Sequence, residues 1–155
     1  MANPERQLWV WLDHKMHGHW VAQRIENEVG RDTPDVWFAM HKLRPVNGWL
    51  ELKVLSAIPA APASPLRLPG WSPGQRNWAL KATREGALVW LVLKIVEIEQ
   101  VFFVPAQLAA TDLVVNTRPH KETLEQWHKL GFSVEIGDPV GRQVQRILDV
   151  LHSVC

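Results

Sequence analysis

The chain has 155 residues, 46% of them hydrophobic and 21% charged, which is an ordinary composition for one globular domain that buries its own core. Its single cysteine, Cys155, excludes an internal disulfide and fits a reducing cytosol, and a net charge of +1 provides no overall basic field of the kind that attracts nucleic acid. No apolar run approaches the roughly 20 residues that span a bilayer, and Glu5, Arg6 and Asp13 are not typical of a signal peptide, so we expect a cytoplasmic protein without membrane contact.

The first half of the chain predicts one helix followed by three strands. A helix is expected over residues 4–18, because apolar residues such as Leu8 and Leu12 recur there at helical spacing. Short apolar runs predict strands at 20–25, 35–40 and 48–55. Several tryptophans lie within these patterns or in the next strand and are expected in the core: Trp9, Trp11, Trp37, Trp49 and Trp90.

The middle of the chain begins with a proline-rich loop. Residues 59–73 contain five prolines and can form neither a helix nor a central strand. Ser72 as N-cap and Pro73 at the first helical position predict a helix that runs to about residue 85 and ends at Gly86. After it we expect a strand buried on both faces at 87–92, a further strand at 101–104 and a helical turn at 105–109.

The last third of the chain predicts two helices, at 121–130 and 140–151. The second has an apolar stripe that fits either a dimer face or packing against the sheet: Val144, Ile147, Leu148 and Leu151. Together the elements predict an α/β fold with a mixed central sheet of four to five strands flanked by helices. Residues 1–110 would form the core, and 111–155 a C-terminal helical extension packed on the same domain.

Charged residues on the strand at 48–55 are the first candidates for chemistry. Side chains alternate between the two faces of a strand, so Glu51 and Lys53 share one face, roughly 7 Å apart. Asp35 begins the preceding strand and comes beside Glu51 if the two strands pair as a hairpin. Two such carboxylates suit a hard divalent cation, and Lys53 is placed to orient water or neutralise a phosphate. By themselves, Glu51 and Lys53 fit an exposed ion pair on a half-solvated strand better than a site, because such triplets are common.

The wider sequence resembles a family of nucleases. Thr33-Pro34-Asp35-Val36-Trp37 followed by Trp49-Leu50-Glu51-Leu52-Lys53-Val54 resembles the PD-(D/E)XK signature. Ser72-Pro73-Gly74-Gln75-Arg76-Asn77-Trp78, with Gly86 and an apolar strand after it, is similar to the glutamine-bearing helix of archaeal-type Holliday junction resolvases and of VRR-NUC domains, which are frequent in phages. Phe102-Phe103-Val104-Pro105 resembles the closing strand of the resolvases. The resemblance covers residues 5–108; the proline loop is longer than in compact members, and the segment after Ala109 has no counterpart.

This resemblance implies a restriction-endonuclease-like core and a set of site residues. Asp35 and Glu51 would be metal ligands, Lys53 the catalytic lysine, and Gln75 the glutamine beside the metal. The first-helix glutamate of the family corresponds to Glu5, a third metal ligand, with Glu26 and Glu28 as alternatives for that role. The implied metal is Mg²⁺, with Mn²⁺ as a substitute, and no small-molecule cofactor is expected.

Basic residues around these positions are candidates for DNA contact, with an ordinary solvated surface as the alternative. Arg24, Arg31, Lys42 and Arg44 flank Asp35, and Arg67, Arg76, Lys81 and Arg84 lie near or on the helix of Gln75. Trp71, in the proline loop, is the best exposed aromatic for stacking on a base. His14, His17 and His19 have no cysteine or well-placed carboxylate to complete a zinc site.

The resemblance therefore predicts a metal-dependent DNA endonuclease that acts on branched DNA in recombination or repair. It implies products with 5′-phosphate and 3′-hydroxyl ends, and a homodimer that cuts two symmetric strands. One alternative is a flap- or duplex-cutting nuclease of the restriction or repair type. Another is a non-catalytic DNA-binding accessory protein on the same fold, although the presence of Asp35, Glu51 and Lys53 argues against it.

Overall fold

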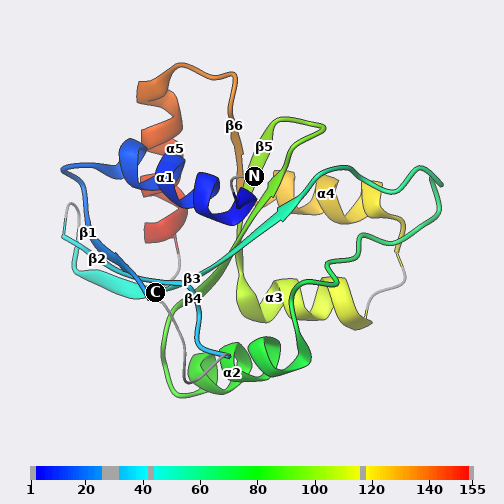
Figure 1. Cartoon of the computed structure of the whole chain (residues 1–155), viewed down its shortest axis with the longest axis horizontal. Coiled ribbons are helices and arrows are strands. Elements are labelled where there is room, and N and C mark those ends of the chain that lie inside the picture. The colour runs from blue at the N-terminus through cyan, green and yellow to red at the C-terminus, as the bar shows by residue number, and fades with distance from the viewer. Residues whose placement is uncertain (1–2, 26–31, 42–43, 116–117, 154–155) are drawn as a thin grey trace.

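In the part of the chain that the computed structural model describes, residues 3–25, 32–41, 44–115 and 118–153, a six-stranded sheet is flanked by five α-helices (Figure 1). The strands lie in the sheet in chain order: β1 (Val21–Arg24), β2 (Val36–Met40), β3 (Val46–Leu55), β4 (Val89–Ile95), β5 (Gln100–Pro105) and β6 (Ser133–Glu135). The helices are α1 (Pro4–Met16), α2 (Pro73–Arg84), α3 (Ala106–Ala110), α4 (His120–Lys129) and α5 (Val140–His152), with a π-helical turn, η1 (Thr111–Val115), directly after α3.

Neighbouring strands are antiparallel except for β3 and β4, which run parallel. A parallel pair needs a long crossover, which the proline loop and α2 supply. The predicted α/β class with a mixed sheet is therefore confirmed. The sequence predicted at most five strands, and the structure has six. The missed strand is β6, whose three residues are too few for an alternating pattern to stand out in the sequence.

Each face of the sheet carries its own hydrophobic core. Helices α1 and α5 cover one face, and α2, α3 and α4 cover the other (Figure 1). The first core includes Leu8, Leu12, Leu50, Phe103 and Ile147, and the second includes Ala79, Leu91, Leu93, Ala109 and Trp127. Of the tryptophans expected inside, Trp90 is buried, Trp9, Trp11 and Trp49 pack against the margins of a core, and Trp37 is half-buried.

The segment after residue 110 contributes a strand to the sheet and side chains to both cores. Strand β6 pairs with β5, with Val134 opposite Val101. The apolar stripe of α5 packs inward, since Ile147 and Leu151 are fully buried. Of the two uses expected for this stripe, packing against the sheet is the one realised, and the stripe is not available as a dimer face. The expectation of a purely helical extension was incomplete, because this segment adds an edge strand.

One residue in the turn between β4 and β5 has strained backbone geometry. Glu99 has φ 52°, and it is the only non-glycine residue with positive φ among the described residues. This region costs an L-residue roughly 1 kcal/mol that glycine avoids. We expect Glu99→Gly to raise the melting temperature by about 2–4 °C in thermal unfolding. Glu99→Ala keeps the Cβ atom and should shift it by less than about 1 °C; equal gains in both variants would contradict the strain.

Among the described residues, no helix combines the length and the apolar character needed to cross a bilayer.

Candidate active site

Strand β3 presents two kinds of side chain on its two faces. Leu50 and Leu52 are fully buried in the first core. Glu51 and Lys53 point to the opposite face, where their partners on β4 are Leu91 and Leu93 of the second core. Glu51 is 2% exposed and Lys53 is 7% exposed. A carboxyl and an amine are therefore embedded in an apolar face, which is costly unless partners compensate.

Asp35 joins this pair because β2 begins one residue after it. Val36 lies opposite Leu50, so the same antiparallel register places Asp35 opposite Glu51. Beyond that point, no strand among the described residues pairs with β3 on this side, and the Asp35 carboxylate takes the place of a strand partner. Its Oδ2 accepts a hydrogen bond from the backbone N–H of Leu52 at 2.8 Å. The half-buried Asp35 side chain is thus oriented by the strand that carries Glu51.

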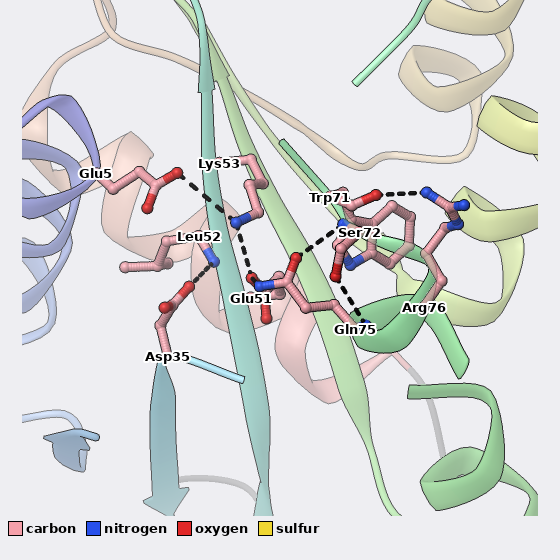
Figure 2. A network of polar contacts seen from close by, with 9 residues as sticks. All are labelled: Glu5, Asp35, Glu51, Leu52, Lys53, Trp71, Ser72, Gln75 and Arg76. Atoms are coloured by element: carbon pink, nitrogen blue, oxygen red, sulfur yellow. Dashed lines mark hydrogen bonds and ion pairs between the residues drawn. The ribbon is translucent and has the colours of Figure 1, made fainter. Parts of the chain in front are cut away.

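Lys53 connects two carboxylates from different elements. Its Nζ lies 3.0 Å from Oε1 of Glu51 and 3.7 Å from Oε1 of Glu5, in the first turn of α1 (Figure 2). The Glu5 side chain is 35% exposed, against 3% for Glu51. The cluster is therefore exposed to solvent at Glu5, on the side of α1, and buried at Glu51, on β3.

Gln75 reaches the same cluster from the N-terminus of α2. Its Nε2 donates a hydrogen bond to Oε1 of Glu51 at 3.0 Å. Its other end forms a capping box with Ser72: the Ser72 N–H donates to Gln75 Oε1, and Ser72 Oγ accepts from the Gln75 N–H. The Ser72-x-x-Gln75 spacing is the sequence signature of this box. That signal predicts the Ser72 contact, which the family resemblance does not supply.

The charges in the cluster do not balance. Burial, the neighbouring Asp35 and, least of the three, Glu5 raise the pKa of the Glu51 carboxyl from 4.5 to about 8, against the lowering effect of Lys53. Burial by itself would lower the pKa of Lys53, but Glu51, Glu5 and Asp35 together raise it above its ordinary value. Without a bound cation, Glu51 therefore holds a proton near neutral pH while Lys53 stays charged.

The donor set suits a hard divalent cation, yet the side chains are not arranged around one. Among the described residues, no three His, Cys, Asp or Glu side chains converge closely enough to hold a metal ion. The reason is local: Lys53 lies against Glu51 and Glu5, and Glu51 Oε1 faces Lys53 and Gln75. Asp35 and Glu51 lie opposite each other in the register of β2 and β3, and their role as metal ligands stays a prediction. Glu5 contacts Lys53, and its role as a ligand stays a prediction.

The structure brings together all five residues predicted for the reaction: Glu5, Asp35, Glu51, Lys53 and Gln75 (Figure 2). The predicted DNA-binding residues are more scattered. Arg24 is half-buried at the end of β1, opposite Val36, and Lys81 is exposed on α2. Arg67 and Arg84 are also exposed. Residues Glu26, Glu28, Arg31 and Lys42 lie outside the described residues.

Two of the arginines are engaged with backbone carbonyls. The Arg76 guanidinium donates to the Trp71 carbonyl, just before the α2 cap. Arg44 donates to the carbonyl of His152 at the end of α5. Arg44 precedes the start of β3, whereas Glu51 lies in its second half, so Arg44 is far from the acids.

A hollow of about 760 Å³ lined by Trp20, Met40 and Val46 also lies at the β3 start, away from the carboxylates.

The expectation that Trp71 is exposed was wrong. Trp71 is 1% exposed and packs in the second core with Leu66, because the proline loop folds back over the sheet. It cannot stack on a base without unfolding that loop. We expect Trp71→Phe to leave the affinity for DNA, measured by fluorescence anisotropy with Ca²⁺, within about twofold, and Trp71→Ala to cost about 3–5 kcal/mol in urea unfolding. A tenfold loss of affinity in folded Trp71→Phe would restore the stacking role.

No protein-family model matches this chain, and no curated protein matches it. Among solved structures, it is similar to Hjc, a Holliday junction resolvase from the archaeal hyperthermophile Archaeoglobus fulgidus. The two share 23% sequence identity, the match covers 66% of this chain and 74% of that chain, and the TM-score is 0.45.

Proposed function

We propose that this protein is a metal-dependent endonuclease that hydrolyses phosphodiester bonds in DNA, with branched DNA as its preferred substrate. The observation that carries the proposal is the surplus of negative charge around Glu51. Three carboxylates gather at one lysine, and the most buried of them has its pKa raised to about 8. Strongly perturbed groups of this kind are typical of functional sites, and a divalent cation would relieve the imbalance.

The orientation of the two central carboxylates supports Mg²⁺ as the partner, with Mn²⁺ as a substitute. Asp35 uses Oδ2 to accept the Leu52 N–H, and Glu51 uses Oε1 to accept from Lys53 and Gln75. Each carboxylate is thereby held by one oxygen and keeps the other for an ion. Carboxylate oxygens are the ligands that Mg²⁺ prefers. Bound there, the ion supplies Lewis-acid stabilisation of the phosphate and lowers the pKa of a water molecule.

The remaining residues then have separate tasks. Asp35 and Glu51 hold the ion, and the Lys53 ammonium neutralises a non-bridging phosphate oxygen or orients the attacking water. Gln75 keeps Glu51 turned toward the ion, and Glu5 keeps Lys53 charged on the solvent side of the cluster. Arg24 and Lys81 are candidates for contacts to phosphates outside the reacting group.

The preference for branched DNA and the homodimer rest on the motif resemblance. The order of the Asp35, Glu51-Leu52-Lys53 and Gln75 motifs supports a nuclease of the resolvase type, which cuts two symmetric strands as a dimer and leaves 5′-phosphate ends. We propose the same for this chain, acting in the cytosol in recombination or repair. A phage origin fits the likeness to VRR-NUC domains.

The substrate proposal is tested with end-labelled four-way junction, flap and linear duplex DNA in Mg²⁺. Wild-type protein should cut the junction fastest, at symmetric positions on opposed strands, and Asp35→Asn prepared in parallel should control for contaminating nuclease. Faster cutting of the flap or the linear duplex would instead identify a nuclease of the repair or restriction type. Tight DNA binding without cleavage under any divalent ion would favour the non-catalytic accessory protein.

A further inference from the structure

The side chain of Gln75 has two ends of similar shape but opposite hydrogen-bonding character. An amide nitrogen donates, whereas an amide oxygen accepts and would repel a carboxylate. In this structure the oxygen end takes part in the capping box of α2, because Gln75 Oε1 accepts a hydrogen bond from the Ser72 N–H at 2.9 Å. The nitrogen end therefore faces Glu51, at 3.0 Å from Oε1 (Figure 2). The capping box thus selects the orientation of the carboxamide that is attractive to Glu51.

This orientation has a consequence for Glu51. Two donors, Gln75 Nε2 and Lys53 Nζ, both meet Oε1 at 3.0 Å. No described hydrogen bond or ion pair ends on Oε2 of the same carboxylate. If the carboxamide turned over, the amide oxygen would face Oε1, and the carboxylate would lose one of the two contacts that fix its rotation.

The same helical turn also packs against the segment that leads to Asp35. Gly74 lies so close to Asp32 that a Cβ atom at position 74 would meet Asp32 Oδ1 at 2.4 Å. Asp32 precedes Asp35 by three residues. The first turn of α2 therefore contacts both acid-bearing segments, one through Gly74 and the other through Gln75.

We propose that Ser72 is a positioning residue of this site. Its hydroxyl caps α2 and thereby fixes its own backbone N–H against Gln75 Oε1. That N–H holds the Gln75 carboxamide in the orientation that binds Glu51 Oε1, and so leaves Glu51 Oε2 to bind a divalent cation. The inference rests on the proposed function for the identity of the ligand. The orientation of Gln75 is independent of that function and can be measured without metal or DNA.

Four variants separate this role from simple loss of helix stability. Ser72→Ala removes the hydroxyl that accepts the Gln75 N–H, and Ser72→Thr keeps a hydroxyl there. Gln75→Met removes both side-chain contacts of Gln75. Ala82→Gly is the matched control, since it weakens the same helix by a similar amount at a position away from the cap.

The first readout is hydrogen exchange of the Gln75 side-chain amide, followed by NMR in metal-free protein. Exchange should be slow in wild type, Ser72→Thr and Ala82→Gly, and faster by about tenfold in Ser72→Ala. The second readout is the dissociation constant for Ca²⁺ by calorimetry. The dissociation constant should rise about fivefold in Ser72→Ala and about tenfold in Gln75→Met. The double variant that combines Ser72→Ala with Gln75→Met should show no further rise beyond Gln75→Met.

Three results would overturn the proposal: unchanged amide exchange in Ser72→Ala, a Ca²⁺ affinity that falls equally in Ala82→Gly, or additive losses in the double variant. Restoration by Ser72→Thr of both the slow exchange and the affinity would support it. Failure of wild type to bind Ca²⁺ would count against the proposed metal site, whereas the amide exchange decides the role of Ser72 separately.

Discussion

Replacing Glu51 by glutamine should abolish Mg²⁺-dependent cleavage of DNA while making the metal-free protein more stable at alkaline pH. Glutamine keeps the shape of Glu51 and still accepts hydrogen bonds from Lys53 and Gln75, but it carries no negative charge. We expect a loss of activity of at least about 10³-fold, since the variant removes a carboxylate that we propose as a metal ligand. If Glu51 only stabilised the fold, Glu51→Gln would make the metal-free protein less stable instead of more stable.

The pH dependence follows from the direction of the Glu51 shift. Folding raises the pKa of this carboxyl from 4.5 to about 8, so the folded protein holds a proton that the unfolded chain releases between these values. Stability of the metal-free wild type should therefore fall as pH rises from about 4.5 to 8 and then level off. The gain of Glu51→Gln over wild type should be small near pH 4.5 and on the order of 2–4 kcal/mol at pH 8.5.

Thermal unfolding of both proteins across this pH range, with and without Mg²⁺, measures the effect. At pH 8.5 without metal, Glu51→Gln should melt roughly 5–10 °C above wild type. Addition of Mg²⁺ should narrow that gap, because the ion binds the ionised wild-type site and not the variant. A wild type that is more stable than Glu51→Gln at pH 8.5 without metal would show that the buried carboxyl is already well compensated.

The second large effect is expected for Lys53→Met, which should keep metal binding but lose cleavage. The variant removes the ammonium that contacts Glu51 and Glu5 but leaves all three carboxylates. Because a cation no longer competes with the metal, Ca²⁺ should bind at pH 9 at least as tightly as in wild type. Cleavage should fall by about 10²–10⁴-fold, since the ammonium that we propose to stabilise charge on the phosphate or orient the water is gone.

Calorimetry with Ca²⁺ and initial rates of DNA cleavage in Mg²⁺ check this pair of outcomes. Lys94→Met is the matched control: Lys94 is a half-buried lysine on the neighbouring strand β4, opposite Val54, and faces the other core. Its activity should stay within about twofold of wild type. Parallel loss of Ca²⁺ binding and cleavage in Lys53→Met would mean that Lys53 holds the site together and has no separate part in the reaction.

Much of the candidate site could be predicted from the sequence because strand geometry is regular. The alternation along β3 places Glu51 and Lys53 on one face, and the hairpin register brings Asp35 opposite Glu51. The proximity of Glu5 to Lys53 and of Gln75 to Glu51 depends on how two helices pack on the sheet. Local patterns carry no such information, and the resemblance to a nuclease family supplied it.

Other features could not be predicted because tertiary packing overrides local composition. The proline loop reads as solvent-exposed, yet it buries Trp71 and Leu66 over the second core. Strand β6 is too short to show a period and exists because β5 offers it an edge. The stripe on α5 is equally suited to a partner chain or to the protein's own sheet, and Ile147 shows that the sheet uses it.

We propose that Asp35 and Glu51 form a metal site that cleaves DNA, and one assay tests this site most directly. End-labelled four-way junction is incubated with wild-type protein or Asp35→Asn, in Mg²⁺ or in excess chelator, and the products are sized on a denaturing gel. We predict cleavage by wild type in Mg²⁺, with neither the chelated sample nor Asp35→Asn producing more than about a thousandth of that rate. Equal cleavage by Asp35→Asn, or cleavage by wild type in chelator, would contradict the assignment.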